Sequence, residues 1–107
     1  IVYSVSVNIV NNIEQEWLKY MIEFHIPEVI QTGCFESYSI RKEITPQSTE
    51  SAGYNIEYYC KDLTELDRYQ ENFAKELQKD HTKRYQGKFT ASRKIFTIIS
   101  CIWSREF

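Results

Sequence analysis

His25 is the side chain of this sequence best suited to proton transfer, because an imidazole ordinarily titrates near neutral pH. It begins the segment HIPEVI and lies two residues before Pro27. It could act as a general acid or base on a ligand. Alternatively, it could only cap the C-terminal end of a helix, where a cationic ring is favoured by the helix dipole and by free carbonyl groups. Both roles remain open at this stage.

Aromatic and basic side chains could form a binding site around this histidine. Residues at these spacings more often belong to the core, but buried tyrosine hydroxyls need partners, which indicates at least one wet or ligand-filled space. Arg41 either pairs with Glu57 across a predicted hairpin or meets an anionic ligand. The candidates for binding a small apolar or aromatic molecule are Tyr3, Trp17, Tyr20, Tyr38, Tyr58 and Arg41.

Metal and cofactor chemistry find little support in the sequence. His25 and His81 fall on different predicted elements, with no ligand spacing around either, so we expect no metal site and no cofactor. The three cysteines, Cys34, Cys60 and Cys101, lie in apolar stretches without a CxxC motif. This pattern favours reduced, buried thiols in a cytoplasmic protein over a disulfide framework.

Composition narrows the class of protein further. A chain of 107 residues that is 42% hydrophobic can bury one core, so we expect a single domain over residues 1–107. The formal charge is −2 and no run of five like charges occurs, which argues against nucleic acid and against a polybasic membrane anchor. No apolar run approaches the roughly 20 residues needed to cross a membrane. We also expect no signal peptide.

The first predicted strand and the helix that follows it determine the position of His25. Strict alternation over residues 1–10 predicts a strand with Tyr3 on one side and Ser4 on the other. Asn11 or Asn12 would then cap a helix that carries an aromatic stripe toward the sheet. Pro27 should push the residue before it away from helical angles, so the helix should break or kink near His25. A short further turn from Glu28 to Gln31 can follow, and Thr32-Gly33 should end it. The stripe consists of Ile13, Trp17, Tyr20, Met21 and Phe24.

The rest of the chain supplies three more strands and one helix. Strands are predicted at 34–44, at 54–60 and from Phe89 to Trp103, the last apolar on both sides as in a covered strand. Residues 45–53 read as an exposed hairpin loop. A helix starts after an Asp62 and Glu65 capping box and either extends to about Arg84 or unwinds after His81, with Gly87 as the stop. The order βαββαβ predicts an α+β, ferredoxin-like sandwich: a four-stranded antiparallel sheet with two helices on one face.

The second face of this sheet has no helix to cover it. It carries small hydroxyls where a solvated face usually carries Lys and Glu. A homodimer packed sheet to sheet would explain this composition, whereas an open, serine-rich face is the alternative. The residues concerned are Ser4, Ser6, Asn8, Ser37, Ser39, Arg41, Asn55, Glu57 and Tyr59.

Two segments resemble a known family. EQEWLKYMIEFHIPEVIQTGCF and RYQGKFTASRK resemble a small bacterial family of unknown function, in which W-x-x-(W/Y)-M-x-x-x-H-I-P and T-G-x-F recur. That family is similar to the dimeric α+β barrel superfamily, whose ferredoxin-like protomers pair through their sheets and which includes small monooxygenases and isomerases. The resemblance implies a cavity between the first helix and the sheet, with His25 at its mouth. It implies no activity.

Two functions from different classes follow from these observations. The first is a homodimeric small-molecule-binding or interaction module. The second is a cofactor-independent enzyme of the small monooxygenase or isomerase type, with His25 as proton shuttle. We favour the first, because a proton shuttle needs a second polar group beside it and the sequence nominates none.

Overall fold

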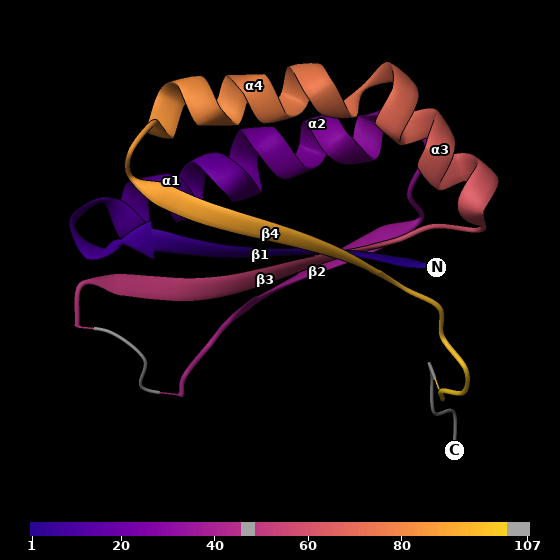
Figure 1. Ribbon diagram of the computed structural model, residues 1–107, viewed down its shortest axis with the longest axis horizontal. Helices are drawn as coiled ribbons and strands as arrows, with labels where there is room; N and C mark the ends of the chain where they lie inside the picture. The colour runs from indigo at the N-terminus through magenta and orange to yellow at the C-terminus, as the bar shows by residue number, and fades with distance from the viewer. Residues whose placement is uncertain (46–48, 103–107) are drawn as a thin grey trace.

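The computed structural model describes residues 1–45 and 49–102 and contains one layer of strands and one layer of helices (Figure 1). The predicted order βαββαβ and the antiparallel α+β architecture are confirmed, with each predicted helix divided into shorter pieces. In chain order the elements are β1 (Val2–Val10), the 3₁₀ helix η1 (Asn11–Ile13), α1 (Glu14–Tyr20), the π-helix η2 (Met21–His25), α2 (Ile26–Gln31), β2 (Ser37–Lys42), β3 (Ser51–Tyr59), α3 (Leu63–Asn72), α4 (Ala74–Tyr85) and β4 (Phe89–Phe96).

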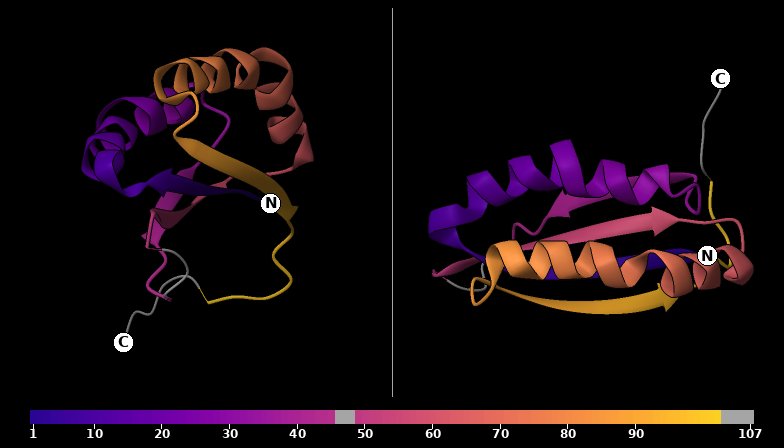
Figure 2. Two further views of the ribbon diagram at one scale, coloured as in Figure 1. Left: turned by 60° about the vertical axis from the view of Figure 1, so that its left-hand side comes forward. Right: turned by 90° about the horizontal axis from the view of Figure 1, so that it is seen from above.

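The strands lie in the order β2-β3-β1-β4, so β1 is central and β2 and β4 form the edges. β1 pairs antiparallel with both neighbours, and Val5 lies opposite Ile56 of β3 and Arg93 of β4. All the helices cover one face of the sheet, as both views in Figure 2 show. We call the helix-covered face, which carries Tyr3 and Val5, the inner face, and the opposite one the outer face. The alternation predicted for β1 and β3 matches this division.

The core fills the space between the inner face and the helices. Its members come from every layer because the odd positions of β1, the even positions of β3 and one stripe of each helix meet there. The largest fully buried side chains are Trp17, Ile9, Ile26, Ile56, Leu66 and Val29.

The first helix does not end at His25. Ile26 keeps helical angles of φ −62° and ψ −45°, so the predicted displacement of this residue from helical angles was wrong. The predicted further turn through Gln31, with a stop at Thr32-Gly33, is confirmed. The N–H of Ile26 bonds to the carbonyl of Met21, five residues back. This π turn adds one residue to the helix directly before Pro27. Pro27 itself has no N–H and so donates no helical hydrogen bond. His25 is therefore an interior residue of a continuous helix, and a role as C-terminal cap is excluded.

The π turn also changes which side chains face the sheet. Buried positions step from Met21 to Ile26, a spacing of five residues, and Phe24 is turned outward with 58% of its surface exposed. Phe24 was predicted to lie in the inward stripe. The predicted cap at Asn11 or Asn12 was also wrong, because η1 precedes α1 and the Asn11 amide donates to the carbonyl of Thr49 instead.

The second helical segment begins as predicted. The Asp62 carboxylate accepts a hydrogen bond from the backbone N–H of Glu65 at 3.0 Å. A break at Phe73, with φ −130°, separates α3 from α4. Gly87 adopts a positive φ of 76° just beyond Tyr85, a conformation that glycine takes at little cost.

The edge strands are shorter than predicted. β2 covers residues 37–42 instead of 34–44, and β4 ends at Phe96; the predicted end at Trp103 lies outside the described residues. The inner strand β3, by contrast, starts earlier than predicted, at Ser51. Of the predicted loop, residues 46–48 also lie outside the described residues. β4 is an uncovered edge strand within this chain, with Ile95 53% and Phe96 48% exposed.

Candidate functional site

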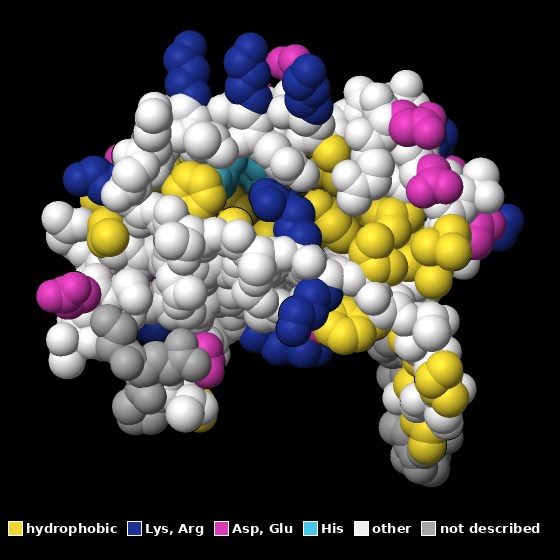
Figure 3. Space-filling view, in the orientation of Figure 1, with side chains coloured by type: hydrophobic (Ala, Val, Ile, Leu, Met, Phe, Trp, Pro, Cys, Tyr) yellow, Lys and Arg dark blue, Asp and Glu magenta, His cyan; other side chains and the backbone are white. Residues whose placement is uncertain are grey.

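A small hollow lies between the inner face of the sheet and the helical layer. Its volume is about 30 Å³, or about 420 Å³ when its open side is included. The smaller volume holds about one or two water molecules. Figure 3 shows a face on which histidine, hydrophobic and basic side chains lie together in the region of α4 and β4. The hollow is lined by Tyr3, Val5, Val7, Met21, His25, Ile56, Tyr58, Tyr69, Gln78, His81 and Arg93.

His25 enters this lining from the last position of the π turn. Burial, together with a smaller effect of the Arg93 charge, lowers the pKa of His25 to about 4, and Asp80 opposes the shift. The imidazole is therefore neutral at pH 7, and it can accept a proton only from a fairly strong acid or when an anion is bound beside it.

His81 reaches the same hollow from α4. Its ring centre lies 5.6 Å from that of His25, although 56 positions separate the two in the sequence. The indole Nε1–H of Trp17 donates to His81 Nε2 at 2.9 Å, and both residues are buried. Burial lowers the pKa of His81 to about 4, with smaller effects of His25 and Arg93 in the same direction.

Arg93 is the cation of the hollow. It projects from the inner face of β4, opposite Val5 of β1. No Asp or Glu is among the lining residues that the structure describes, and none of the ion pairs within residues 1–45 and 49–102 includes Arg93. Because Arg93 is the only charged side chain in the described lining, the hollow carries a net positive charge when both histidines are neutral.

Tyrosine hydroxyls and one amide complete the polar lining. Gln78 Nε2 donates to the Tyr3 hydroxyl at 3.5 Å. Burial raises the pKa of Tyr3, and the nearby Arg93 opposes that rise. Burial also raises the pKa values of Tyr58 and Tyr69, so all three phenols stay protonated at neutral pH.

The structure brings some of the predicted site residues together and separates others. His25, Tyr3 and Tyr58 line the hollow. Trp17 is fully buried behind it, and the Tyr20 ring packs against both histidines and against Tyr85. Tyr38 lies on the edge strand β2 and is 41% exposed.

Arg41 lies outside the hollow. It projects from the outer face of β2 and pairs with Glu57 of β3, its guanidinium 3.3 Å from the carboxylate. This is the cross-hairpin pair that the sequence predicted.

Four polar lining residues were not predicted as members of the site: Tyr69, Gln78, His81 and Arg93. Two signals in the sequence could have located these residues. Arg93 shares the period-two phase of Phe89 and Ala91, which face inward, and His81 continues the helical stripe that passes through Leu77.

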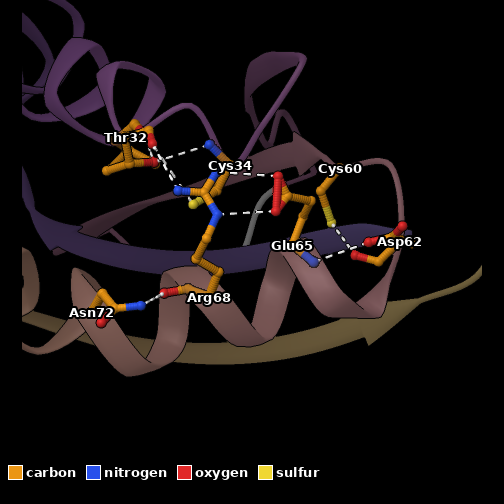
Figure 4. Close-up of polar contacts among 8 residues, drawn as sticks. Thr32, Cys34, Cys60, Asp62, Glu65, Arg68 and Asn72 are labelled. Carbon is orange, nitrogen blue, oxygen red and sulfur yellow. Dashed lines mark hydrogen bonds and ion pairs between the residues drawn. The ribbon is translucent and has the colours of Figure 1, made fainter.

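A second polar cluster joins α2 to α3 near two cysteines (Figure 4). Arg68 pairs with Glu65 at 3.0 Å and donates to the carbonyl of Thr32 at 3.4 Å. Cys34 and Cys60 are free and buried beside it, as predicted, whereas Cys101 is exposed because β4 ends before it. Within residues 1–45 and 49–102, no group of three or more His, Cys, Asp or Glu side chains is arranged to hold a metal ion.

Comparison with models of known protein families assigns the chain to a family. A family model described as a domain of unknown function matches residues 1–99. The chain belongs to the DUF4286 family. This membership confirms the resemblance drawn from residues 14–35 and 84–94. No curated protein matches the DUF4286 chain. In the part of the chain that the structure describes, no helix is both long enough and apolar enough to cross a membrane.

Solved structures similar to this DUF4286 chain share its fold at low sequence identity. A dimeric ferredoxin-like protein from an uncultured marine organism has a TM-score of 0.65 and 13% identity, covering 97% of this chain and 100% of its own. SnoaB, a cofactor-independent oxygenase from Streptomyces nogalater, has a TM-score of 0.64 and 13% identity over 94% and 95%. An ethyl tert-butyl ether D (EthD) family protein from Bacillus halodurans has a TM-score of 0.62 and 10% identity over 91% and 100%. These likenesses show a ferredoxin-like fold.

Proposed function

We propose that this protein binds a small, largely apolar molecule with an anionic oxygen, in the hollow between the helices and the inner face of the sheet. The observation that carries the proposal is Arg93, a cation facing neutral histidine, tyrosine and amide side chains with no carboxylate in the described lining. Arg93 is solvent-exposed, but its guanidinium offers several N–H donors in a fixed fork that matches the two oxygens of a carboxylate.

The shape of the hollow supports this class of ligand. Its closed part of about 30 Å³ accepts only a small polar end of a molecule, which would reach the two histidines. The rest of the ligand would lie toward the open side, where the inner face of β4 leaves Ile95 53% exposed. Sites for small molecules commonly combine such an apolar wall with a few converging polar groups.

The proposal is tested with benzoate and benzamide, which differ in charge but hardly in shape. We expect benzoate to bind more tightly in titration calorimetry, and Arg93→Met to weaken benzoate binding about tenfold or more while leaving benzamide unaffected. Lys79→Met is the matched control, since it removes an equal charge from the exposed side of α4. Equal affinities for the two compounds, absence of benzoate binding, or an equal effect of the two substitutions would contradict the proposal.

A second candidate function is catalysis by proton transfer, favoured by the neutral His25 next to Arg93. An enolisable ligand could transfer a proton from carbon to the His25 imidazole, while the guanidinium stabilises the enolate oxygen that forms. A protein of similar fold is described as a cofactor-independent oxygenase, which fits chemistry that begins with such an anion.

This second function has its own experiment. 1-Phenylbutane-1,3-dione in heavy water exchanges the hydrogens between its carbonyl groups, and NMR follows the rate. We expect the protein to accelerate the exchange and His25→Gln to abolish the acceleration, while benzoate binding survives. Exchange at the uncatalysed rate with the unmodified protein would leave binding as the function.

We also infer that the protein acts as a homodimer that packs through its outer faces. A fold relative is described as dimeric. The side chains at the centre of the outer face are small and polar: the Asn55 amide donates hydrogen bonds to the hydroxyls of Ser4 and Ser6 at 2.8 and 3.2 Å. Beyond β4, Ile98, Ile99 and Ile102 are 38–89% exposed within one chain, and association would bury such side chains.

Light scattering at micromolar concentration tests the dimer. We expect a dimer for the unmodified protein and for Ser6→Ala. A shift to monomer is expected for Ser6→Lys, which places a charged side chain at the centre of the outer face. A monomeric unmodified protein would overturn the inference.

A further inference from the structure

We propose that Trp17 fixes His81 as a permanent hydrogen-bond donor of this site, so that the site selects ligands with an accepting oxygen such as a carboxylate or enolate. The inference rests on the proposed function and deepens it. It assigns His81 as a specificity-determining residue and Trp17 as the residue that positions its proton.

The bond between Trp17 and His81 determines the tautomer of the histidine. An indole nitrogen can only donate, so His81 Nε2, at 2.9 Å, must be the acceptor. A neutral imidazole with an unprotonated Nε2 carries its proton on Nδ1. Adding a second proton would require breaking a buried hydrogen bond. His81 is therefore held in one neutral form.

The remaining nitrogen of His81 is free to act on a ligand. Within residues 1–45 and 49–102, Trp17 is the only hydrogen-bond partner of His81, and the histidine lines the hollow together with His25 and Arg93. Its Nδ1–H and the Arg93 guanidinium are two donors to the same small space. Ligand amines and ammonium groups would meet donors there, whereas a carboxylate or enolate oxygen would accept from both.

The same arrangement assigns different roles to the two histidines. No indole holds His25, whose ring centre lies 5.6 Å from that of His81. His25 can therefore exchange tautomers or accept a proton without breaking such a bond, whereas His81 must first give up its bond to Trp17. If His81 were only a satisfied core residue, Trp17 would still bond to it, but its Nδ1 proton would have no effect on ligand choice.

Nitrogen NMR of the histidine-labelled protein tests the first step without any ligand. The pattern of ¹⁵N shifts and two-bond couplings reports which ring nitrogen carries the proton. We expect His81 to be the Nδ1–H tautomer in the unmodified protein and to exchange between both tautomers in Trp17→Phe. An Nε2–H tautomer of His81 in the unmodified protein would overturn the inference, whatever the protein binds.

Benzoate binding tests the second step with a matched pair of variants. His81→Asn keeps an amide N–H near the position of Nδ1, whereas His81→Leu removes the donor. We expect benzoate affinity to fall about tenfold in His81→Leu and to be largely retained in His81→Asn. Unchanged affinity in both variants would overturn the inference and leave the proposed function intact. If the unmodified protein binds no benzoate, the proposed function fails, and the inference about ligand choice fails with it even if the NMR tautomer is as expected.

Discussion

Arg41 and Arg93 project from strands of one sheet but differ in what surrounds them. Arg41, on the outer face, lies 3.3 Å from the carboxylate of Glu57. Arg93, on the inner face, lines a hollow with His25 and His81 and belongs to none of the ion pairs in the described part of the chain. On the outer face Arg41 is paired with a carboxylate, whereas on the inner face Arg93 lies beside neutral acid and base groups. This difference supports the proposal that a ligand binds at the inner face, although its tyrosines and histidines resemble ordinary core residues.

The two faces should differ most in how much they stabilise the fold. Ile56 is 1% exposed on the inner face, and Ile56→Ala should lower the free energy of unfolding by about 2–5 kcal/mol because it leaves a cavity. Ser6→Ala on the outer face should change it by less than about 0.5 kcal/mol. Urea unfolding measures both, and equal losses would show that the outer face is packed like the inner one.

Acid should weaken the inner face first. The pKa values of His25 and His81 are lowered to about 4 in the fold, against an ordinary value of 6.5. Between these values the unfolded chain binds more protons, so their contribution to stability is complete above pH 6.5 and is lost as the pH falls toward 4. The limit is about 1.4 kcal/mol per pH unit and per histidine, and His25, which is only partly buried, should reach less.

Unfolding curves between pH 7 and pH 5 measure this loss, because most carboxyl groups stay ionised in that range. His25→Gln should make the dependence shallower by removing one of the two histidines. A free energy of unfolding that does not change over this range would mean that the histidines are hydrated and that the inner face is no drier than the outer one.

The smallest effect is expected for the outer pair. Arg41→Met should lower the free energy of unfolding by about 1 kcal/mol or less, and added salt should remove most of the difference, since water screens an exposed ion pair. Benzoate affinity should not change, because Arg41 faces away from the hollow. A large drop in benzoate affinity would place the anion site on the outer face instead.

Local patterns in the sequence were sufficient to predict the sheet. β1 and β3 alternate strictly, the Asp62 cap follows the capping-box spacing, and the Arg41–Glu57 pair follows from hairpin register. The π turn was not predictable, because proline ordinarily disfavours helical angles before it and nothing local indicates that an inserted residue will compensate. The exposed position of Phe24 is a consequence of the same turn.

The site itself depends on contacts between distant segments. His25 was identified from its titration range, but its neighbours His81 and Arg93 come from α4 and β4 and meet it only through the packing of those elements on the sheet. The position of Trp17 in the helical stripe correctly predicted that it is buried. It gave no indication that the indole would donate a hydrogen bond to a histidine. Single side chains were therefore predictable from their chemistry, and the cluster required the fold.

The ionisation of bound 4-nitrophenol tests the central claim most directly, because its anion is yellow and reports its own protonation. A spectrophotometric pH titration at saturating protein should give a pKa for the bound phenol below that of the free compound, and Arg93→Met should remove the shift while Lys79→Met preserves it. A pKa that is unchanged or raised on binding would contradict the account, since it would mean that the hollow does not favour an anionic oxygen.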